Sequence, residues 1–264
     1  MTMDDLRPTT DVHVELSGSL AVLTIDGPQS HNAISRPAMD ALSWALDEVE
    51  ASSAHVVAIR GAGDRVFVSG GDLKELSTIR TVADAEAMAR RMRDLLDRVA
   101  GLPMPVVAVL NGSAFGGGCE LAVACDLRVA PADVRLAFNQ IELGIMPAWG
   151  GLERLTSLVG SGRAMRMALT GESIDAATAH GWGLVDVLVT RDELDARVQA
   201  LLERLAAAPR AAVLGIKSVA RPSVLPVDGH VEAAISAFAR TWVHEDHWAA
   251  VDRMQERRRA GRSS

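Results

Sequence analysis

Apolar and polar residues alternate near the start of the chain in the pattern of a β-hairpin. Val12, Val14 and Leu16 alternate with polar neighbours, which is typical of a strand with one buried face. The sequence Ser17-Gly18-Ser19 then favours a turn, and residues 20–25 form a second apolar segment. We therefore predict two antiparallel strands joined by a tight connection.

After this hairpin, the pattern switches between helices and short apolar strands. Met39, Leu42 and Val49 recur at helical spacing, and Ser35 and Pro37 mark the start of that helix. Such alternation predicts the α/β class. Further strands are expected at residues 56–59, 105–110, 126–130 and 184–189, and further helices at residues 84–100, 152–159 and 163–169.

The last third of the chain has a different pattern, because only helical periodicity is found after Arg191. Helices are predicted at residues 192–207 and over one long final segment, residues 230–259. The sequence contains no internal repeat and no flexible linker between domains. We therefore expect a flexible N-terminus (residues 1–11), an α/β core (residues 12–190) and a helical C-terminal region (residues 191–264).

Composition and charge narrow the class of protein. The 264 residues are 48% hydrophobic and 23% charged, as in an ordinary globular protein. The net charge of −7 argues against nucleic-acid binding, which needs an excess of Lys and Arg. The two cysteines, Cys119 and Cys125, do not make the disulfide framework of a small secreted protein. No apolar segment is long enough for a signal peptide or a membrane span, so we expect a cytoplasmic protein.

Two glycine-containing loops are the strongest chemical signals in the sequence. Residues 69–72 (Ser-Gly-Gly-Asp) and residues 116–118 (Gly-Gly-Gly) each follow a predicted strand and precede a helix. Such loops present backbone N–H groups to an anion, although either loop alone is also compatible with a simple turn. The spacing does not match a dinucleotide-binding fingerprint or a phosphate-binding P-loop. We therefore expect main-chain donors that bind a different anionic group.

Five segments resemble the crotonase (enoyl-CoA hydratase/isomerase) family in order and spacing. They are HNAIS (31–35), VFVSGGDLKEL (66–76), PVVAVLNGSAFGGGCELAVACDLRVA (105–130), LGIMPAWGGLERL (143–155) and LTGESIDAATAHGWGLVDVLV (169–189). The resemblance covers about residues 12–259. It implies a crotonase-like ββα spiral core, a helical C-terminal oligomerisation region, and a homotrimer or a dimer of trimers.

The resemblance also implies a catalytic site. The N–H groups of Gly71 and Gly117 would form an oxyanion hole for a thioester carbonyl that gains enolate charge. Glu120, in the first turn of the following helix, matches a catalytic glutamate of the family's hydratases. Counting back from Leu143-Gly144 without a gap places Gln140 at the second acid, whereas aligning forward from Phe138 selects Glu142. Glutamine cannot transfer a proton at neutral pH. With Gln140 in the second acid position, a hydration mechanism that uses two glutamates would lack one of its proton-transferring groups.

Several other residues are expected near the substrate. Asn32 and Ala33 fall in a loop that resembles the family's coenzyme A-contacting segment, and Trp149 is expected close to the acyl group. Lys74 and Arg257 are candidates for the phosphates of coenzyme A, with Arg257 supplied by another subunit. The remaining expected binding residues lie in or beside the glycine loops: Ser69, Gly70, Asp72, Leu73 and Gly116.

The resulting hypothesis is an acyl-CoA enzyme that needs no metal and no cofactor beyond the coenzyme A of its substrate. The favoured function is hydration or isomerisation of an α,β-unsaturated thioester. A decarboxylase of a malonyl-CoA derivative such as ethylmalonyl-CoA is the alternative, because segment 138–151 also resembles such enzymes. A non-catalytic acyl-CoA-binding scaffold is a third. His244 and His247 are expected to form a surface pair, and both cysteines to be buried and unreactive.

Overall fold

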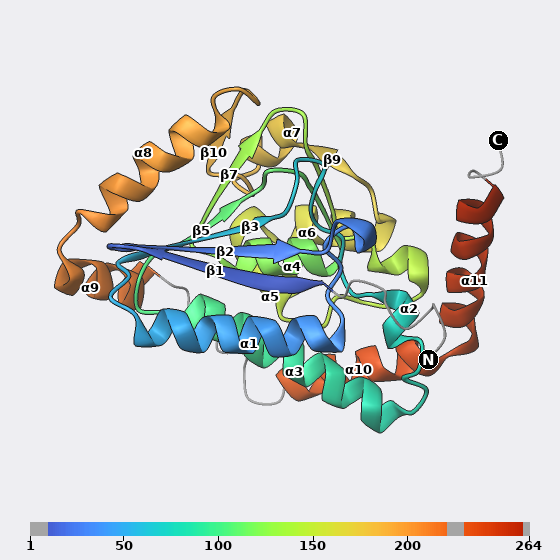
Figure 1. Cartoon of the computed structure of the whole chain (residues 1–264). Coiled ribbons are helices and arrows are strands. Elements are labelled where there is room, and N and C mark those ends of the chain that lie inside the picture. The colour runs from blue at the N-terminus through green and yellow to red at the C-terminus, as the bar shows by residue number, and fades with distance from the viewer. Residues whose placement is uncertain (1–9, 221–229, 261–264) are drawn as a thin grey trace.

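The computed structural model describes residues 10–220 and 230–260, and its centre is a six-stranded sheet (Figure 1). The first two strands form the expected antiparallel hairpin, and the others run parallel. In spatial order the strands are β1 (Asp11–Ser17), β2 (Leu20–Asp26), β3 (Val56–Gly61), β5 (Val106–Val109), β7 (Leu127–Pro131) and β10 (Val187–Val189).

A smaller, four-stranded sheet carries the segments that the sequence analysis singled out. Its strands, in order, are β4 (Val66–Val68), β6 (Ser113–Phe115), β8 (Arg135–Ala137) and β9 (Ile174–Asp175). The first three run parallel, and β9 is antiparallel to β8. Parallel strands end at the same edge of a sheet, so the loops after β4, β6 and β8 meet there.

Helices cover both faces of the larger sheet (Figure 1). The helices of the described residues are α1 (Arg36–Ala51), α2 (Leu73–Leu76), α3 (Val82–Gly101), α4 (Gly117–Ala124), α5 (Gly151–Val159), α6 (Ser161–Thr170), α7 (Ala176–Gly181), α8 (Leu194–Ala206), α9 (Arg210–Ala220), α10 (His230–Val243) and α11 (Glu245–Ala260), with the 3₁₀ turns η1 (Pro28–Ser30) and η2 (Gln140–Leu143).

The central strands of the larger sheet, β3 and β5, are buried on both faces, which explains why they are uninterrupted apolar runs. In β3, Val57 and Ile59 join the main core with α1 and α3. Val56 and Ala58 face the other way, into a second cluster that includes residues of α8. Successive side chains of a strand point to opposite faces, so one apolar run supplies both clusters.

Most predicted elements are confirmed, with small shifts in their boundaries. The helix expected after Ser35 begins at Arg36, and the Ser35 side chain caps it by accepting a hydrogen bond from Ala38 N. The helix expected near Cys119 begins two residues earlier, at Gly117. Thr10 is buried and β1 begins at Asp11, and the division of the chain into three regions stays a prediction. Residues 1–9 lie outside the described part of the chain.

Two segments have local structure that the sequence pattern did not specify. Residues 140–143, which carry both Gln140 and Glu142, form the turn η2. The final helical segment, expected over residues 230–259, is divided into α10 and α11, which meet at His244.

The C-terminal helices pack directly on the core. Arg90 of α3 forms an ion pair with Glu232 of α10 at 2.7 Å, and the indole N–H of Trp242 donates to the carbonyl oxygen of Ile79 at 3.1 Å. Helix α11 stands at the side of the molecule (Figure 1). The role of this region in oligomerisation stays a prediction.

Candidate active site

The two glycine loops predicted to form an oxyanion hole lie against each other. They follow β4 and β6, which are adjacent parallel strands. A Cβ atom placed on Gly70 would lie 3.3 Å from the backbone nitrogen of Gly117, so the two backbones are in close contact. Gly70 has a φ of 105° and Gly116 a φ of 52°, a region of backbone conformation that favours glycine. Both turns therefore depend on glycine.

Two backbone N–H groups remain unused where these loops meet. Ile34 pairs with Gly71 in a parallel bridge, donating its N–H to Gly70 O and accepting from the N–H of Asp72. That pattern directs the N–H of Gly71 away from Ile34. Gly117 is the first residue of α4, whose first N–H groups have no acceptor within the helix. Among residues 10–220 and 230–260, neither nitrogen has a hydrogen-bond acceptor.

The indole of Trp149 packs across both loops and is buried. A Cβ atom on Gly117 would lie 2.0 Å from Cζ3 of this ring, and one on Gly71 would lie 3.8 Å from Cζ2. Only glycine therefore fits at position 117. The ring forms one wall of the place where the two loops meet, and its expected contact with an acyl group stays a prediction.

The carboxyl group of Glu120 is buried and held by three hydrogen bonds. Its Oε2 accepts from the backbone N–H groups of Trp149 at 2.8 Å and Gly151 at 2.9 Å. Its Oε1 accepts from Nε2 of Gln140 at 3.0 Å. Burial raises the pKa of Glu120 from 4.5 to about 7, against the lowering effect of these bonds, and the charge of Glu153 raises it further. A carboxyl with this pKa both accepts and donates protons near neutrality.

Gln140, and not Glu142, shares the site with Glu120. The Gln140 side chain is buried, and a Cβ atom on Gly116 would lie 3.8 Å from its amide carbon. With Nε2 bound to Glu120, the Oε1 atom has no partner among the described residues. Glu142 is exposed, and its nearest polar partner is the amide of Asn139 at 3.4 Å. Glu142 is thus wrong as a candidate for the second acid position.

The turn formed by Trp149, Gly150 and Gly151 positions Glu120, and of these three residues only Trp149 was expected at the site. Gly150 has a φ of 84°, and a Cβ atom on Gly151 would lie 2.3 Å from Cγ of Glu120, so this position also needs glycine. Behind the turn, Nη1 of Arg154 donates to Trp149 O at 3.3 Å. The Gly-Gly pair before a helix could have indicated this turn from the sequence. Nothing in the sequence indicates the role of Arg154, because its partner is a main-chain oxygen.

Asn32, Ala33 and Ser69, which were expected to bind substrate, form hydrogen bonds within the protein. The Asn32 side chain accepts from Gly27 N and donates to Val66 O, which leaves it committed within the protein. Ala33 is buried, and its N–H donates to Ser30 Oγ. The Ser69 hydroxyl donates to Ser30 O at 3.3 Å. Any ligand contact of Asn32 would therefore involve its backbone.

The charged residues that were expected to bind substrate do not join the buried group around Glu120. Asp72 caps α2 by accepting from the N–H groups of Lys74 and Glu75, and Leu73 is half-buried. Lys74 and Arg257 are exposed, on α2 and α11 respectively. Their contact with substrate phosphates stays a prediction.

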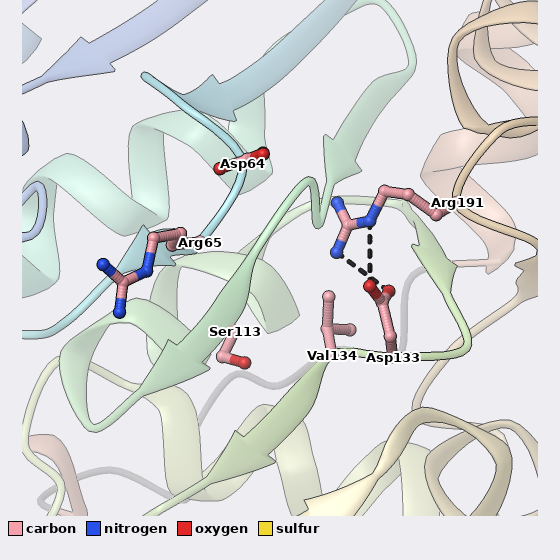
Figure 2. Close-up of a pocket in the computed structure, with 6 residues that line it drawn as sticks. All are labelled: Asp64, Arg65, Ser113, Asp133, Val134 and Arg191. Carbon is pink, nitrogen blue, oxygen red and sulfur yellow. Dashed lines mark hydrogen bonds and ion pairs between the residues drawn. The ribbon is translucent and has the colours of Figure 1, made fainter.

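A separate surface hollow of about 410 Å³ lies at the opposite edge of the smaller sheet (Figure 2). Its lining includes the residues that precede β4 and β8, and the first residue of β6, whereas the candidate site follows these strands. Arg191 and Asp133 form an ion pair across it at 2.8 Å. The lining residues are Asp64, Arg65, Ser113, Asp133, Val134 and Arg191.

Two further predictions concerned reactive side chains. His247 is fully buried, and its Nδ1 lies 2.6 Å from Leu143 O, so the expected surface pair with His244 is wrong. Burial raises the pKa of Cys119 and of Cys125 to about 12, as expected for unreactive thiols. Within the described residues, no cluster of three His, Cys, Asp or Glu side chains could hold a metal. No helix there is long and apolar enough to cross a membrane.

Comparisons with known proteins show which family the chain resembles over most of its length. The family model for enoyl-CoA hydratase/isomerase matches residues 15–261. The chain is 31% identical to the short-chain-enoyl-CoA hydratase of Clostridium acetobutylicum, over 94% of this chain and 96% of that protein. It is 30% identical to the crotonyl-CoA hydratase of Syntrophomonas wolfei, over 95% and 96%. A crystal structure of an enoyl-CoA hydratase from Mycobacterium avium subsp. paratuberculosis K-10 matches with a TM-score of 0.82 and 29% identity, over 93% and 99%. The chain therefore belongs to the enoyl-CoA hydratase/isomerase family.

Proposed function

We propose that this protein hydrates or isomerises an α,β-unsaturated acyl-CoA by stabilising a thioester enolate. One observation carries the proposal: the buried carboxyl of Glu120 accepts from the N–H of Trp149, whose indole packs against Gly71 and Gly117. Among the described residues, the N–H groups of both glycines have no acceptor. Membership of the family and the hydratase names of the relatives support the same substrate class.

The two main-chain donors would act on the thioester carbonyl oxygen. As negative charge develops on that oxygen, both hydrogen bonds strengthen, while the fixed backbone needs no reorganisation. Each such donor contributes roughly 3–4 kcal/mol to transition-state stabilisation. The α-carbon of the enolate would then receive or lose a proton next to Glu120.

In hydration, Glu120 would take a proton from water as the water oxygen bonds to the β-carbon. The same carboxyl would then deliver that proton to the α-carbon, so one water is consumed and no proton is left over. The unpartnered Oε1 of Gln140 is suited to accept a hydrogen bond from the same water. In isomerisation, Glu120 would move one proton between two carbons, which also needs a single carboxyl.

Decarboxylation of a malonyl-CoA derivative is a second candidate, favoured by the neutral amide of Gln140. Loss of carbon dioxide leaves its bonding electrons on the α-carbon and forms the enolate directly, without a base. Protonated Glu120 would then supply the one proton required. At a pKa of about 7, a large fraction of this carboxyl is protonated at neutral pH.

The proposal includes coenzyme A as part of the substrate, with Lys74 and Arg257 as partners of its phosphates, and it needs neither a metal nor a redox cofactor. It also includes a homotrimer or a dimer of trimers. The exposed apolar residues Leu214, Ile216 and Val219 on α9 support burial of that helix between subunits. Sedimentation equilibrium would give the mass of the assembly.

Purified protein assayed with crotonyl-CoA and with ethylmalonyl-CoA distinguishes the candidates. Formation of 3-hydroxybutyryl-CoA supports hydration, and release of carbon dioxide supports decarboxylation. Binding of both thioesters with no turnover would support the third candidate, a non-catalytic acyl-CoA-binding scaffold. Failure to bind any acyl-CoA would refute the proposal.

A further inference from the structure

We infer that the indole of Trp149 limits the acyl group to a short chain, an inference that rests on the proposed function. The ring is part of the surface that an acyl group would contact as soon as its carbonyl oxygen enters the oxyanion hole. This residue therefore determines specificity and takes no part in proton transfer.

The position of the ring relative to both donors supports this role. Its Cζ3 and Cη2 atoms lie against Gly117, and its Cζ2 and Cη2 atoms lie against Gly71. The six-membered ring thus spans the two residues whose N–H groups would hold the thioester oxygen. The carbons next to the carbonyl must lie within a few ångströms of that oxygen, and so beside the indole.

Hydrogen bonds on both sides hold the Trp149 backbone. Its N–H donates to Oε2 of Glu120 at 2.8 Å, and its carbonyl oxygen accepts from Arg154 at 3.3 Å. The next residue, Gly150, has the left-handed φ of 84°. Displacing the backbone to make room for a long chain would break a buried bond to the catalytic carboxyl, which is costly.

The ring also has little free space around it. Only 6% of Trp149 is exposed, and the nearby Leu76 is 1% exposed. A Cβ atom on Gly71 would lie 3.0 Å from Cδ1 of Leu76 and 3.8 Å from the indole, so both side chains close the same side of the loop. Close-packed walls of this kind do not yield to added methylene groups without strain.

The substitution Trp149→Ala separates this role from catalysis. It removes the indole and frees the space of several methylene groups, while the backbone N–H that binds Glu120 is retained. A single methylene in an apolar pocket changes selectivity by roughly 10-fold or more. We therefore expect the ratio of decanoyl-CoA to butyryl-CoA affinity to rise at least about 10-fold in this variant.

Saturated acyl-CoAs give a readout that does not depend on turnover. Calorimetric Kd values for butyryl-, hexanoyl-, octanoyl- and decanoyl-CoA would be measured with wild-type protein, Trp149→Ala and Trp149→Phe. Trp44→Ala is the matched control, because Trp44 is 53% exposed on α1. Wild type and the control should bind butyryl-CoA most tightly, Trp149→Ala should lose that preference, and Trp149→Phe, which keeps an aromatic ring if the Ala variant fails to fold, should be intermediate.

The outcomes separate the two proposals. Equal chain-length profiles in wild type and both Trp149 variants would overturn the role of Trp149 and leave the proposed function intact. Wild-type binding of decanoyl-CoA as tight as that of butyryl-CoA would do the same. Absence of binding by every acyl-CoA would refute the proposed function, and the inference with it.

Discussion

The raised pKa of Glu120 predicts that a neutral replacement of this carboxyl gains stability relative to wild type as pH rises through about 7. In Glu120→Gln, the new amide oxygen still accepts from the N–H groups of Trp149 and Gly151. After rotation of the Gln140 amide, the new NH₂ group can donate to Oε1 of Gln140, which has no partner among the described residues of the wild-type protein. The hydrogen bond between the two side chains is therefore kept, and an unpaired amide oxygen of Gln140 is replaced by an unpaired NH₂ group.

The size of the effect follows from proton linkage. The pKa of Glu120 is 4.5 when freely solvated and about 7 in the folded protein, so the folded state holds the proton more tightly. The stability gained from this proton is fully present below the unfolded pKa and is lost as pH rises through about 7. A difference of about 2.5 pKa units corresponds to about 3 kcal/mol, of which about 2.5 kcal/mol is lost between pH 5 and pH 8.

Urea unfolding of wild type and Glu120→Gln, at several pH values and one protomer concentration, measures this quantity. The stability of the variant relative to wild type should rise by about 2 to 3 kcal/mol from pH 5 to pH 8. Glu142→Gln is the control, because that carboxyl is exposed. Turnover of Glu120→Gln should fall about 10²- to 10⁴-fold. Parallel stability curves would refute the raised pKa, and unchanged turnover would refute the catalytic role.

Three further substitutions test the surroundings of this carboxyl. Gly117→Ala places a Cβ atom 2.0 Å from Cζ3 of Trp149, so turnover should fall at least about 10-fold and urea unfolding should show a loss of about 1–3 kcal/mol. Burial lowers the pKa of His247, so this residue contributes stability that is lost as pH falls below about 6.5. In urea unfolding, His247→Asn should therefore gain stability relative to wild type as pH falls through this range, whereas the control His244→Asn should keep a constant difference from wild type. Gln140→Glu adds a second carboxyl beside Glu120, so the apparent pKa in the pH–rate profile should rise by about one unit or more. An unchanged apparent pKa would contradict the site geometry.

The fold was largely predictable because its strands and helices have strong local signals. The parallel strands are buried on both faces, so β3 and β5 appear in the sequence as uninterrupted apolar runs. The two-residue strand β9 was missed, since a strand of that length leaves no periodic pattern. The break between α10 and α11 was missed as well, because His247 is held by packing between distant elements and by a main-chain oxygen.

The site was only partly predictable from the sequence. The glycines were found because close backbone approach has a residue-type signature. The hydrogen bonds that hold Glu120 come from backbone N–H groups, which every residue except proline carries, so no sequence pattern marks them. Whether Gln140 or Glu142 faces Glu120 depended on a 3₁₀ turn, whose period differs from both an extended strand and an α-helix.

The amide of Gln140 bears on which reactions the site favours. A carboxylate in its place would lie about 3 Å from Oε1 of Glu120, where two negative charges repel by about 5 kcal/mol at an effective dielectric of 20. Such a pair shares one proton, so its two apparent pKa values move apart and the higher one lies above that of either acid alone. The amide donates a hydrogen bond to Glu120 instead, which lowers the pKa of Glu120 against the effect of burial. The site therefore holds one exchangeable proton near neutral pH. Reactions that move a single proton on or off an enolate fit this arrangement, whereas a mechanism that needs separate acid and base carboxyls does not.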